Sequence, residues 1–394
     1  MHLSPVVKSI VEPATLLMAR RSRELRAQGR DIVDLSLGEP DHAPPAFALE
    51  AAHEALRGPW HKYTPVNGYL DVREAIAAKL QRDNGLAYSP EQIVISTGAK
   101  HSIMNAVMAL CGPGDEVVIP APYWVSYSEQ VKLAGATPVI VRSNLDEDWK
   151  APVDRIASAI TPRTRLLMFS SPCNPSGSVL TRTELEALAA VVARHPGLYV
   201  IADEIYEHIV FEGEHVSFAS LPGMAERTIT VNGLSKAFAL TGWRIGYIGA
   251  PLWIAQACTK VQGQFTSGAN SIAQRVTKAC MEADPALLAP MRADFLRRRD
   301  LTLTAMKAIP GWRCNVPQGA FYLLPDVSAS INGSSIKGAV DLSLHLLDTA
   351  GVSLVEGASF GAEGTLRISY ATSDDKLVEA MARVAKAVAQ LATA

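Results

Sequence analysis

The sequence predicts an α/β protein in which a large domain holds a mostly parallel sheet flanked by helices and a smaller α/β domain follows. From about residue 70, short β-rich runs alternate with helix-like segments. The runs are almost continuously apolar, as expected for strands covered by helices on both faces. The pattern changes over the last hundred residues, and 394 residues are too many for one small core.

The elements of the large domain can be assigned in chain order. A helix-like run begins at Leu70 and ends before Gly85, a residue type favoured directly after a helix. The expected strands are IVIS, DEVVIP, TPVIVRS, RLLMFSS, LYVIADE and TITV, and the helices between them include AKHSIMNAVMAL and TRTELEALAAVVARH. This alternation is the basis for predicting a parallel sheet.

The change of pattern also sets the expected domain boundaries. Residues 1–45 should form an N-terminal arm and part of the small domain, residues 46–290 the large domain, and residues 291–394 the small C-terminal domain. A charged helix-like run in the last segment contains three consecutive arginines at 297–299. Acidic neighbours favour a solvated helix face there over a phosphate site.

Composition excludes several classes of partner. A net charge of -2 and a pI near 6.5 provide no field that would attract nucleic acid or an anionic membrane. Five cysteines without close pairs suggest neither a disulfide framework nor a metal site, and they fit a reducing compartment. The chain shows no signal-peptide pattern and no apolar run of 18 residues, so we expect an untargeted cytoplasmic protein without a metal.

Polar segments follow three of the expected strands, where ligands bind in parallel sheets. They contain Asn174, then Asp203 and Tyr206, and then Lys236, which is followed eight positions later by Arg244. A lysine among small residues can be desolvated and become a nucleophilic amine. Dinucleotide, P-loop and zincin motifs are missing from the sequence. A nucleophilic lysine, an acid for a pyridinium nitrogen and an arginine for a phosphate together describe a pyridoxal 5'-phosphate site.

Several ordered motifs carry a resemblance to a known family. NPSG at 174–177, DEIYEH at 203–208 and SKAFALTGWRIG at 235–246 resemble motifs of the class I, fold-type I pyridoxal phosphate-dependent aminotransferases. The resemblance covers nearly the whole chain and implies that fold and a homodimer with shared active sites. Further stretches resemble the bacterial aspartate and prephenate aminotransferases: LSLGEPD at 35–41, YTPVNG at 63–68, STGAK at 96–100, PYWVSY at 122–127 and LRISYATS at 366–373.

The resemblance implies roles for four residues around the cofactor ring. Lys236 would hold the cofactor covalently and move the proton between the substrate α-carbon and the cofactor. Asp203 would keep the ring nitrogen protonated, which makes the ring an electron sink. Asn174 and Tyr206 would hydrogen-bond the ring oxygen. The structural alternatives are a surface lysine, a helix N-cap, a turn residue before a proline and a half-buried aromatic residue.

The same resemblance implies a phosphate site. Arg244, Ser235 and the backbone amides of Gly98 and Ala99 would bind the phosphate where a turn opens a helix. Tyr63 would reach this phosphate from the other subunit of a homodimer. The alternatives are a simple helix start for the amides and a core or surface position for the tyrosine.

The resemblance implies that Asn174, an arginine, a glycine and an aromatic residue bind the substrate. Arg367 would bind the α-carboxylate bidentately, and the backbone at Gly38 would approach the same carboxylate. Trp124 would stack on the cofactor ring and border the substrate. The alternatives are a structural ion pair, a tight turn and ordinary buried area.

The substrate side chain is assigned through Lys100 and Thr15, which in the resembling subgroup contact a distal carboxylate. Both residues favour aspartate and 2-oxoglutarate as substrates, converted to oxaloacetate and glutamate by a ping-pong mechanism. The alternatives for these residues are a solvent-facing helix position and a first-turn position. Prephenate (arogenate-forming), aromatic or alanine transamination, another pyridoxal phosphate reaction such as that of a lyase, and a non-catalytic ligand-binding module stay open as alternative functions.

Overall fold

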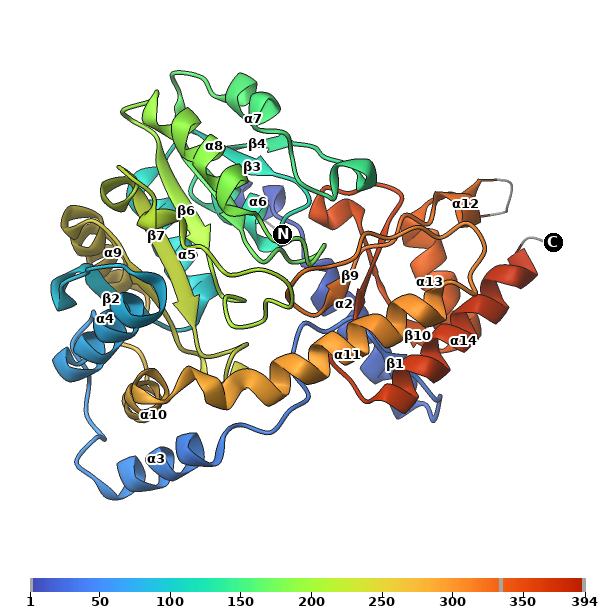
Figure 1. Cartoon of the computed structure of the whole chain (residues 1–394), viewed down its shortest axis with the longest axis horizontal. Helices are drawn as coiled ribbons and strands as arrows, with labels where there is room; N and C mark the ends of the chain where they lie inside the picture. The colour runs from blue at the N-terminus through green and yellow to red at the C-terminus, as the bar shows by residue number, and fades with distance from the viewer. Residues whose placement is uncertain (1–2, 333–335, 392–394) are drawn as a thin grey trace.

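The computed structural model describes residues 3–332 and 336–391, and a seven-stranded sheet forms its centre (Figure 1). β8 runs antiparallel to both its neighbours, β2 and β7, whereas the other neighbouring strands are parallel. The prediction of a mostly parallel sheet is therefore confirmed. In spatial order the strands are β2 (Ile93–Ser96), β8 (Gly246–Gly249), β7 (Thr228–Gly233), β6 (Tyr199–Asp203), β5 (Thr164–Ser170), β3 (Glu116–Pro120) and β4 (Thr137–Val141).

Helices cover both faces of this sheet, which is why its strands are continuously apolar. Met168 packs in one core with α5 (Ala99–Leu110), α6 (Ser126–Leu133) and α9 (Leu252–Phe265). Its neighbour Leu167 packs in another core with α7 (Val153–Ala159) and α8 (Arg182–Ala193), because successive strand residues point to opposite faces. A third core lies at the β2 edge under α3 (Ala46–Arg57), α4 (Leu70–Asn84) and α10 (Ser271–Glu282).

Local sequence signals determine where these helices begin and end. α4 ends at Asn84, and Gly85 follows it in the left-handed conformation with φ of 69°, as predicted. α8 begins after Thr181, whose side chain accepts a hydrogen bond from the backbone of Glu184 in a capping box. Short 3-10 helices occur at η1 (Pro90–Gln92), η2 (Leu145–Glu147), η3 (Phe218–Ser220), η4 (Ala225–Arg227), η5 (Thr241–Trp243), η6 (Pro285–Leu288) and η7 (Ala358–Phe360).

A second, smaller α/β unit is built from the two ends of the chain. β1 (Val33–Asp34) pairs in parallel with β10 (Val352–Ser353), and a separate antiparallel sheet has the order β11 (Val355–Glu356), β12 (Leu366–Ser369), β9 (Tyr322–Leu323). One apolar core joins these strands to the surrounding helices. The helices of these segments are α1 (Pro5–Ser9), α2 (Ala14–Ala27), α11 (Ala289–Met306), α12 (Ser328–Ile331), α13 (Ala339–Ala350) and α14 (Asp374–Leu391).

Helix α11 corrects the interpretation of the arginine cluster as a solvated face. Arg298 and Arg299 are buried, and their guanidinium groups pair with Asp41 at 2.6 Å and Glu212 at 2.8 Å. The side chain of Arg297 is half exposed and fits the prediction. α11 runs from beside α10 to the small unit (Figure 1). Asp41 and Glu212 lie in loops far from these arginines in the sequence, so the local pattern does not reveal them, although Arg299 also pairs with its neighbour Asp300 at 2.9 Å.

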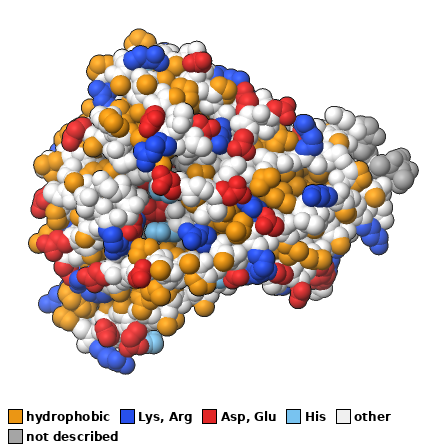
Figure 2. Space-filling view, viewed as in Figure 1, with side chains coloured by type: hydrophobic (Ala, Val, Ile, Leu, Met, Phe, Trp, Pro, Cys, Tyr) orange, Lys and Arg blue, Asp and Glu red, His pale blue; other side chains and the backbone are white. Residues whose placement is uncertain are grey.

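The mixed surface charges and the free cysteines agree with the composition of the sequence. On the face shown in Figure 2, basic and acidic side chains are interspersed. No helix of the described residues is both long and apolar enough to cross a bilayer. All five cysteines are free thiols, and all but Cys314 are buried.

Candidate active site

A cavity of about 320 Å³ opens at the carboxyl ends of the central strands. Asp203 is the last residue of β6, and Lys236 follows three residues after β7. Parallel strands bring their carboxyl ends to one edge of a sheet, so distant polar segments meet there. Twelve predicted site residues line this cavity: Thr15, Gly38, Ala99, Lys100, Trp124, Asn174, Asp203, Tyr206, Ser235, Lys236, Arg244 and Arg367.

Lys236 has the environment of a nucleophilic amine. Burial lowers the pKa of its ammonium group to about 8, and the positive charges of Arg367 and Arg244 act in the same direction, whereas Glu39 opposes them. Nζ donates a hydrogen bond to the carbonyl oxygen of Gly38. The neutral share of this amine, which nucleophilic attack requires, therefore rises steeply between pH 7 and pH 8, far below the range of an ordinary lysine.

Asp203 is a buried carboxylate without a cationic hydrogen-bond partner among residues 3–332 and 336–391. Burial raises its pKa to about 6, although Oδ2 accepts a hydrogen bond from the Tyr127 hydroxyl at 2.6 Å. A protonated ring nitrogen facing this group would favour its ionised form. The sequence reasoning missed Tyr127, which lies in the quoted PYWVSY motif one helical turn after Trp124. The rings of these two residues meet edge to face at 5.7 Å.

The region around Arg244 fits a phosphate. Arg244 has a left-handed backbone with φ of 57°, which is costly for a residue with a side chain, and Nη1 donates to the Thr241 carbonyl at 2.8 Å. A Cβ at Gly98, the N-cap of α5, would lie 2.5 Å from Nη2 of Arg244. A Cβ at Gly246 would lie 2.1 Å from the backbone nitrogen of Ala99. Glycines thus bring an arginine close to a helix N-terminus, where amide groups point outward.

Arg367 is a fully buried cation on β12. Nη1 donates to Oδ1 of Asn174 at 3.0 Å, and Nη2 donates to the carbonyl of Ser36. The guanidinium also lies 4.7 Å from the centre of the Tyr322 ring and 4.9 Å from that of the Phe360 ring. In the described part of the chain no carboxylate pairs with it, so the alternative of a structural ion pair has no support there. Its buried Nε also lacks a partner. A buried, unpaired guanidinium favours binding of an anion.

A second cation stands at the cavity wall. Nζ of Lys100 lies 4.9 Å from the centre of the Trp124 ring, and across the described ranges it makes no ion pair. Thr15 borders the same cavity from the first turn of α2. The residues that line the cavity include four basic side chains and two acidic ones, and this excess of positive charge favours an anionic ligand. The basic residues are Lys100, Lys236, Arg244 and Arg367, and the acidic residues are Glu39 and Asp203.

Two predicted residues do not line the cavity. Gly98 lies behind Arg244, whereas Tyr63 is fully exposed beside a separate hollow of about 630 Å³. A contact of Tyr63 with a phosphate in a second subunit stays a prediction. Sequence reasoning also missed Glu39 and Thr241, whose side chains hydrogen-bond each other at the cavity wall.

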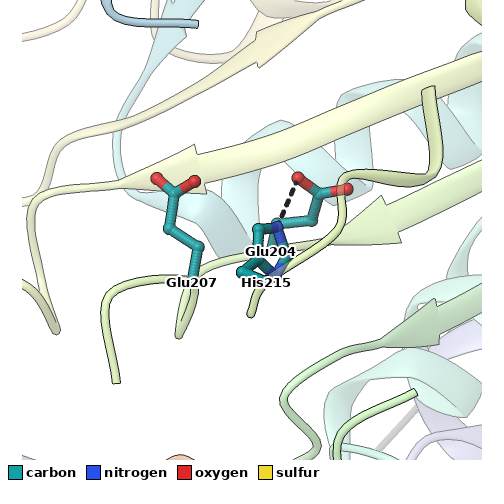
Figure 3. A group of neighbouring side chains, drawn as sticks. All are labelled: Glu204, Glu207 and His215. Carbon is teal, nitrogen blue, oxygen red and sulfur yellow. Dashed lines mark hydrogen bonds and ion pairs between the residues drawn. The ribbon is translucent and has the colours of Figure 1, made fainter. Parts of the chain in front are cut away.

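The acidic residues after Asp203 belong to a different network (Figure 3). Glu204, Glu207 and His215 have possible ligand atoms within 4.8 Å of one another. Their carboxylates are already engaged: Glu204 with His215 at 3.1 Å, and Glu207 with Lys79 and, at 2.6 Å, with Asn84. This group is therefore best described as a set of buried ion pairs in the segment that follows strand β6. The expectation of no metal stays a prediction.

Comparison with known proteins places the chain among characterised sequences. The model of the family described as aminotransferase class I and II matches residues 30–384. The chain is 47% identical to a bifunctional aspartate aminotransferase and glutamate/aspartate-prephenate aminotransferase of Petunia hybrida, over 98% of the chain and 82% of that protein. It is 42% identical to an aspartate/prephenate aminotransferase of Cereibacter sphaeroides, over 97% of both.

Solved structures of aspartate aminotransferases also resemble this chain. The aspartate aminotransferase from Thermus thermophilus with maleate superposes with a TM-score of 0.93 and 41% identity, over 98% of this chain and 100% of that one. The aspartate aminotransferase from Rhizobium meliloti superposes with a TM-score of 0.95 and 38% identity, over 99% and 100%. The architecture described above therefore has close counterparts along nearly its full length.

Proposed function

The chain belongs to the class I and II aminotransferases, and we propose that it transfers the amino group of aspartate to 2-oxoglutarate, giving oxaloacetate and glutamate. The observation that carries this substrate choice is the presence of two unpaired cations in one cavity, buried Arg367 and wall-forming Lys100. Two cations suit the two carboxylates of a dicarboxylic acid. Relatives named aspartate aminotransferase, and a solved relative with maleate, support the same choice.

We propose pyridoxal 5'-phosphate as the cofactor, because each part of the site matches one part of that molecule. When bound, the cofactor supplies the electron sink that weakens the substrate Cα–H bond. Lys236 would hold it covalently, Asp203 would face its ring nitrogen, and Asn174 and Tyr206 would face its ring oxygen. The phosphate would lie at the N-terminus of α5, bound by Arg244, Ser235 and the amides of Gly98 and Ala99, with Tyr63 of the partner subunit.

The chain's own residues divide the work of the reaction. Arg367 and Asn174 orient the substrate α-carboxylate, the backbone at Gly38 approaches it, and Trp124 covers the ring. Burial lowers the pKa of Lys236 to about 8, which makes its neutral form accessible near neutral pH, and in that form Nζ accepts the proton from the substrate Cα and delivers it again. The amino acid leaves as an oxo acid before the second oxo acid enters the same site, so the kinetics should be ping-pong.

The remaining expectations extend this proposal to the assembly and its setting. A homodimer explains why Tyr63 is fully exposed on the isolated chain. The division into residues 1–45, 46–290 and 291–394 is supported by β1 pairing with β10 in the smaller unit. Five free thiols suit a reducing, cytoplasmic compartment.

Prephenate is the second candidate acceptor, because it also carries two carboxylates and the names of four relatives include it. A substrate panel tests both candidates: aspartate, phenylalanine and alanine serve as donors with 2-oxoglutarate, and the same three donors plus glutamate are tested with prephenate. We expect aspartate with 2-oxoglutarate to give the highest kcat/KM. Turnover of alanine or phenylalanine with no turnover of aspartate would show that the assignment through Lys100 and Thr15 is wrong.

A further inference from the structure

Tyr322 lies in the cofactor cavity, and the mechanism above gives it no role. It is on β9, its side chain is fully buried, and its hydroxyl is 2.7 Å from the hydroxyl of Tyr206. Across residues 3–332 and 336–391, Tyr206 is the only hydrogen-bond partner of that hydroxyl. Both phenols line the cavity together with Lys236 and Arg367.

The number of protons on the two hydroxyls limits the hydrogen bonds that this pair can donate. Each phenol carries one proton, and burial raises the pKa of both hydroxyls above the ordinary value, so both protons stay in place at neutral pH. One of the two protons lies between the oxygens. If Tyr206 donates it, Tyr206 has no proton left for a third atom. If Tyr322 donates it, the proton of Tyr206 is free to point into the cavity.

We propose that Tyr322 is a positioning residue that donates its proton to Tyr206 and thereby directs the Tyr206 proton to the ring oxygen of the bound cofactor. The inference rests on the proposed function, because it needs a cofactor oxygen facing Tyr206. A hydroxyl that accepts one hydrogen bond becomes a better donor in the next, so Tyr322 also strengthens the contact it arranges.

The surroundings hold Tyr322 in the place that this role requires. Its ring lies 4.7 Å from the guanidinium of Arg367 and meets the ring of Tyr206 edge to face at 5.9 Å. A Cβ at Gly38 would lie 2.2 Å from the Tyr322 hydroxyl, so that position has room only for glycine. Gly38 thus has a second reason to be glycine besides approaching the substrate carboxylate.

The test is the pH titration of the visible absorption of the holoenzyme without substrate. A donor at the ring oxygen competes with the proton on the nitrogen that joins Lys236 to the cofactor, so weakening this donor raises the pKa of that nitrogen. We expect Tyr322→Phe to raise the midpoint by about half a pH unit, and Tyr206→Phe to raise it more. The double variant should match Tyr206→Phe alone.

A matched control is Tyr370→Phe, which removes another fully buried hydroxyl, bonded at 3.2 Å to the carbonyl of Ala320 and not to Tyr206. Its midpoint should equal that of the unchanged protein. Should Tyr322→Phe fold poorly, 3,5-difluorotyrosine at position 322 provides a stronger donor and should lower the midpoint instead.

Three results would overturn the inference: an unchanged midpoint in Tyr322→Phe, a further rise when Tyr322→Phe is added to Tyr206→Phe, or a rise with difluorotyrosine. Kinetics give an independent reading, because a residue acting through Tyr206 should lower kcat more than it raises KM for aspartate. A purified protein without any visible cofactor band would instead contradict the proposed function itself.

Discussion

Replacing Arg367 by lysine isolates the contribution of its guanidinium to substrate binding. The residue is fully buried, and two of its five N–H groups are used, one by Asn174 and one by the carbonyl of Ser36. Three N–H groups, including the one on the unpartnered Nε, stay available for a carboxylate. Arg367→Lys keeps the positive charge and removes the bidentate geometry.

The expected loss follows from the hydrogen bonds removed. A hydrogen bond to a charged group contributes about 1.5–3 kcal/mol, and lysine offers at least one fewer to the carboxylate. Because about 1.4 kcal/mol corresponds to a factor of ten, kcat/KM should fall on the order of 10- to 100-fold. The loss should be similar for aspartate and for 2-oxoglutarate, since both place an α-carboxylate in the same site.

The assay is steady-state transamination, with oxaloacetate followed by coupled reduction and each substrate varied in turn. Cofactor content and visible spectrum should be unchanged, because Arg367 faces the substrate and not the phosphate. Arg313→Lys is the control, since its side chain is 61% exposed and does not line the cavity. An unchanged kcat/KM in Arg367→Lys, or an equal loss in Arg313→Lys, would refute the reasoning.

Three further predictions concern lysines in different environments. Lys100→Ala should lower kcat/KM for aspartate roughly tenfold and leave alanine unaffected, because alanine has no distal carboxylate; equal losses for both donors would contradict this. Cofactor recombination with the cofactor-free protein should accelerate as pH rises through about 8, since burial lowers the pKa of Lys236 and only the neutral amine attacks; a midpoint near 10.5 would contradict it. Lys79→Met should destabilise the protein to urea by about 3–5 kcal/mol, because it leaves Glu207 buried without its cation, whereas the partly exposed Lys278→Met should cost less than about 1 kcal/mol.

Features that depend on neighbouring residues were predictable from the sequence. Apolar runs such as RLLMFSS located strand β5, and Gly85 located the end of α4, because burial on both faces and helix capping are read from consecutive residues. The rule that ligands bind at strand carboxyl ends then brought Asn174, Asp203 and Lys236 into one cavity.

Features that depend on contacts across the chain were not predictable in this way. Tyr127 and Tyr322 reach their partners over 76 and 116 residues, and no local pattern marks an aromatic hydroxyl as part of a site. Arg298 and Arg299 were assigned to a solvated face because Asp41 and Glu212, which pair with them in the fold, are distant in the sequence. The role of Tyr63 needs a second subunit, so the single chain does not test it.

The central claim is that Lys236 holds the cofactor covalently, and borohydride reduction of the holoenzyme tests it most directly. Reduction makes the bond permanent, and peptide mass spectrometry after digestion then identifies the modified residue. We predict a single pyridoxyl-phosphate adduct on the peptide containing Lys236, and its loss in Lys236→Ala. An adduct on another lysine, or none on a protein that shows the visible cofactor band, would contradict the account.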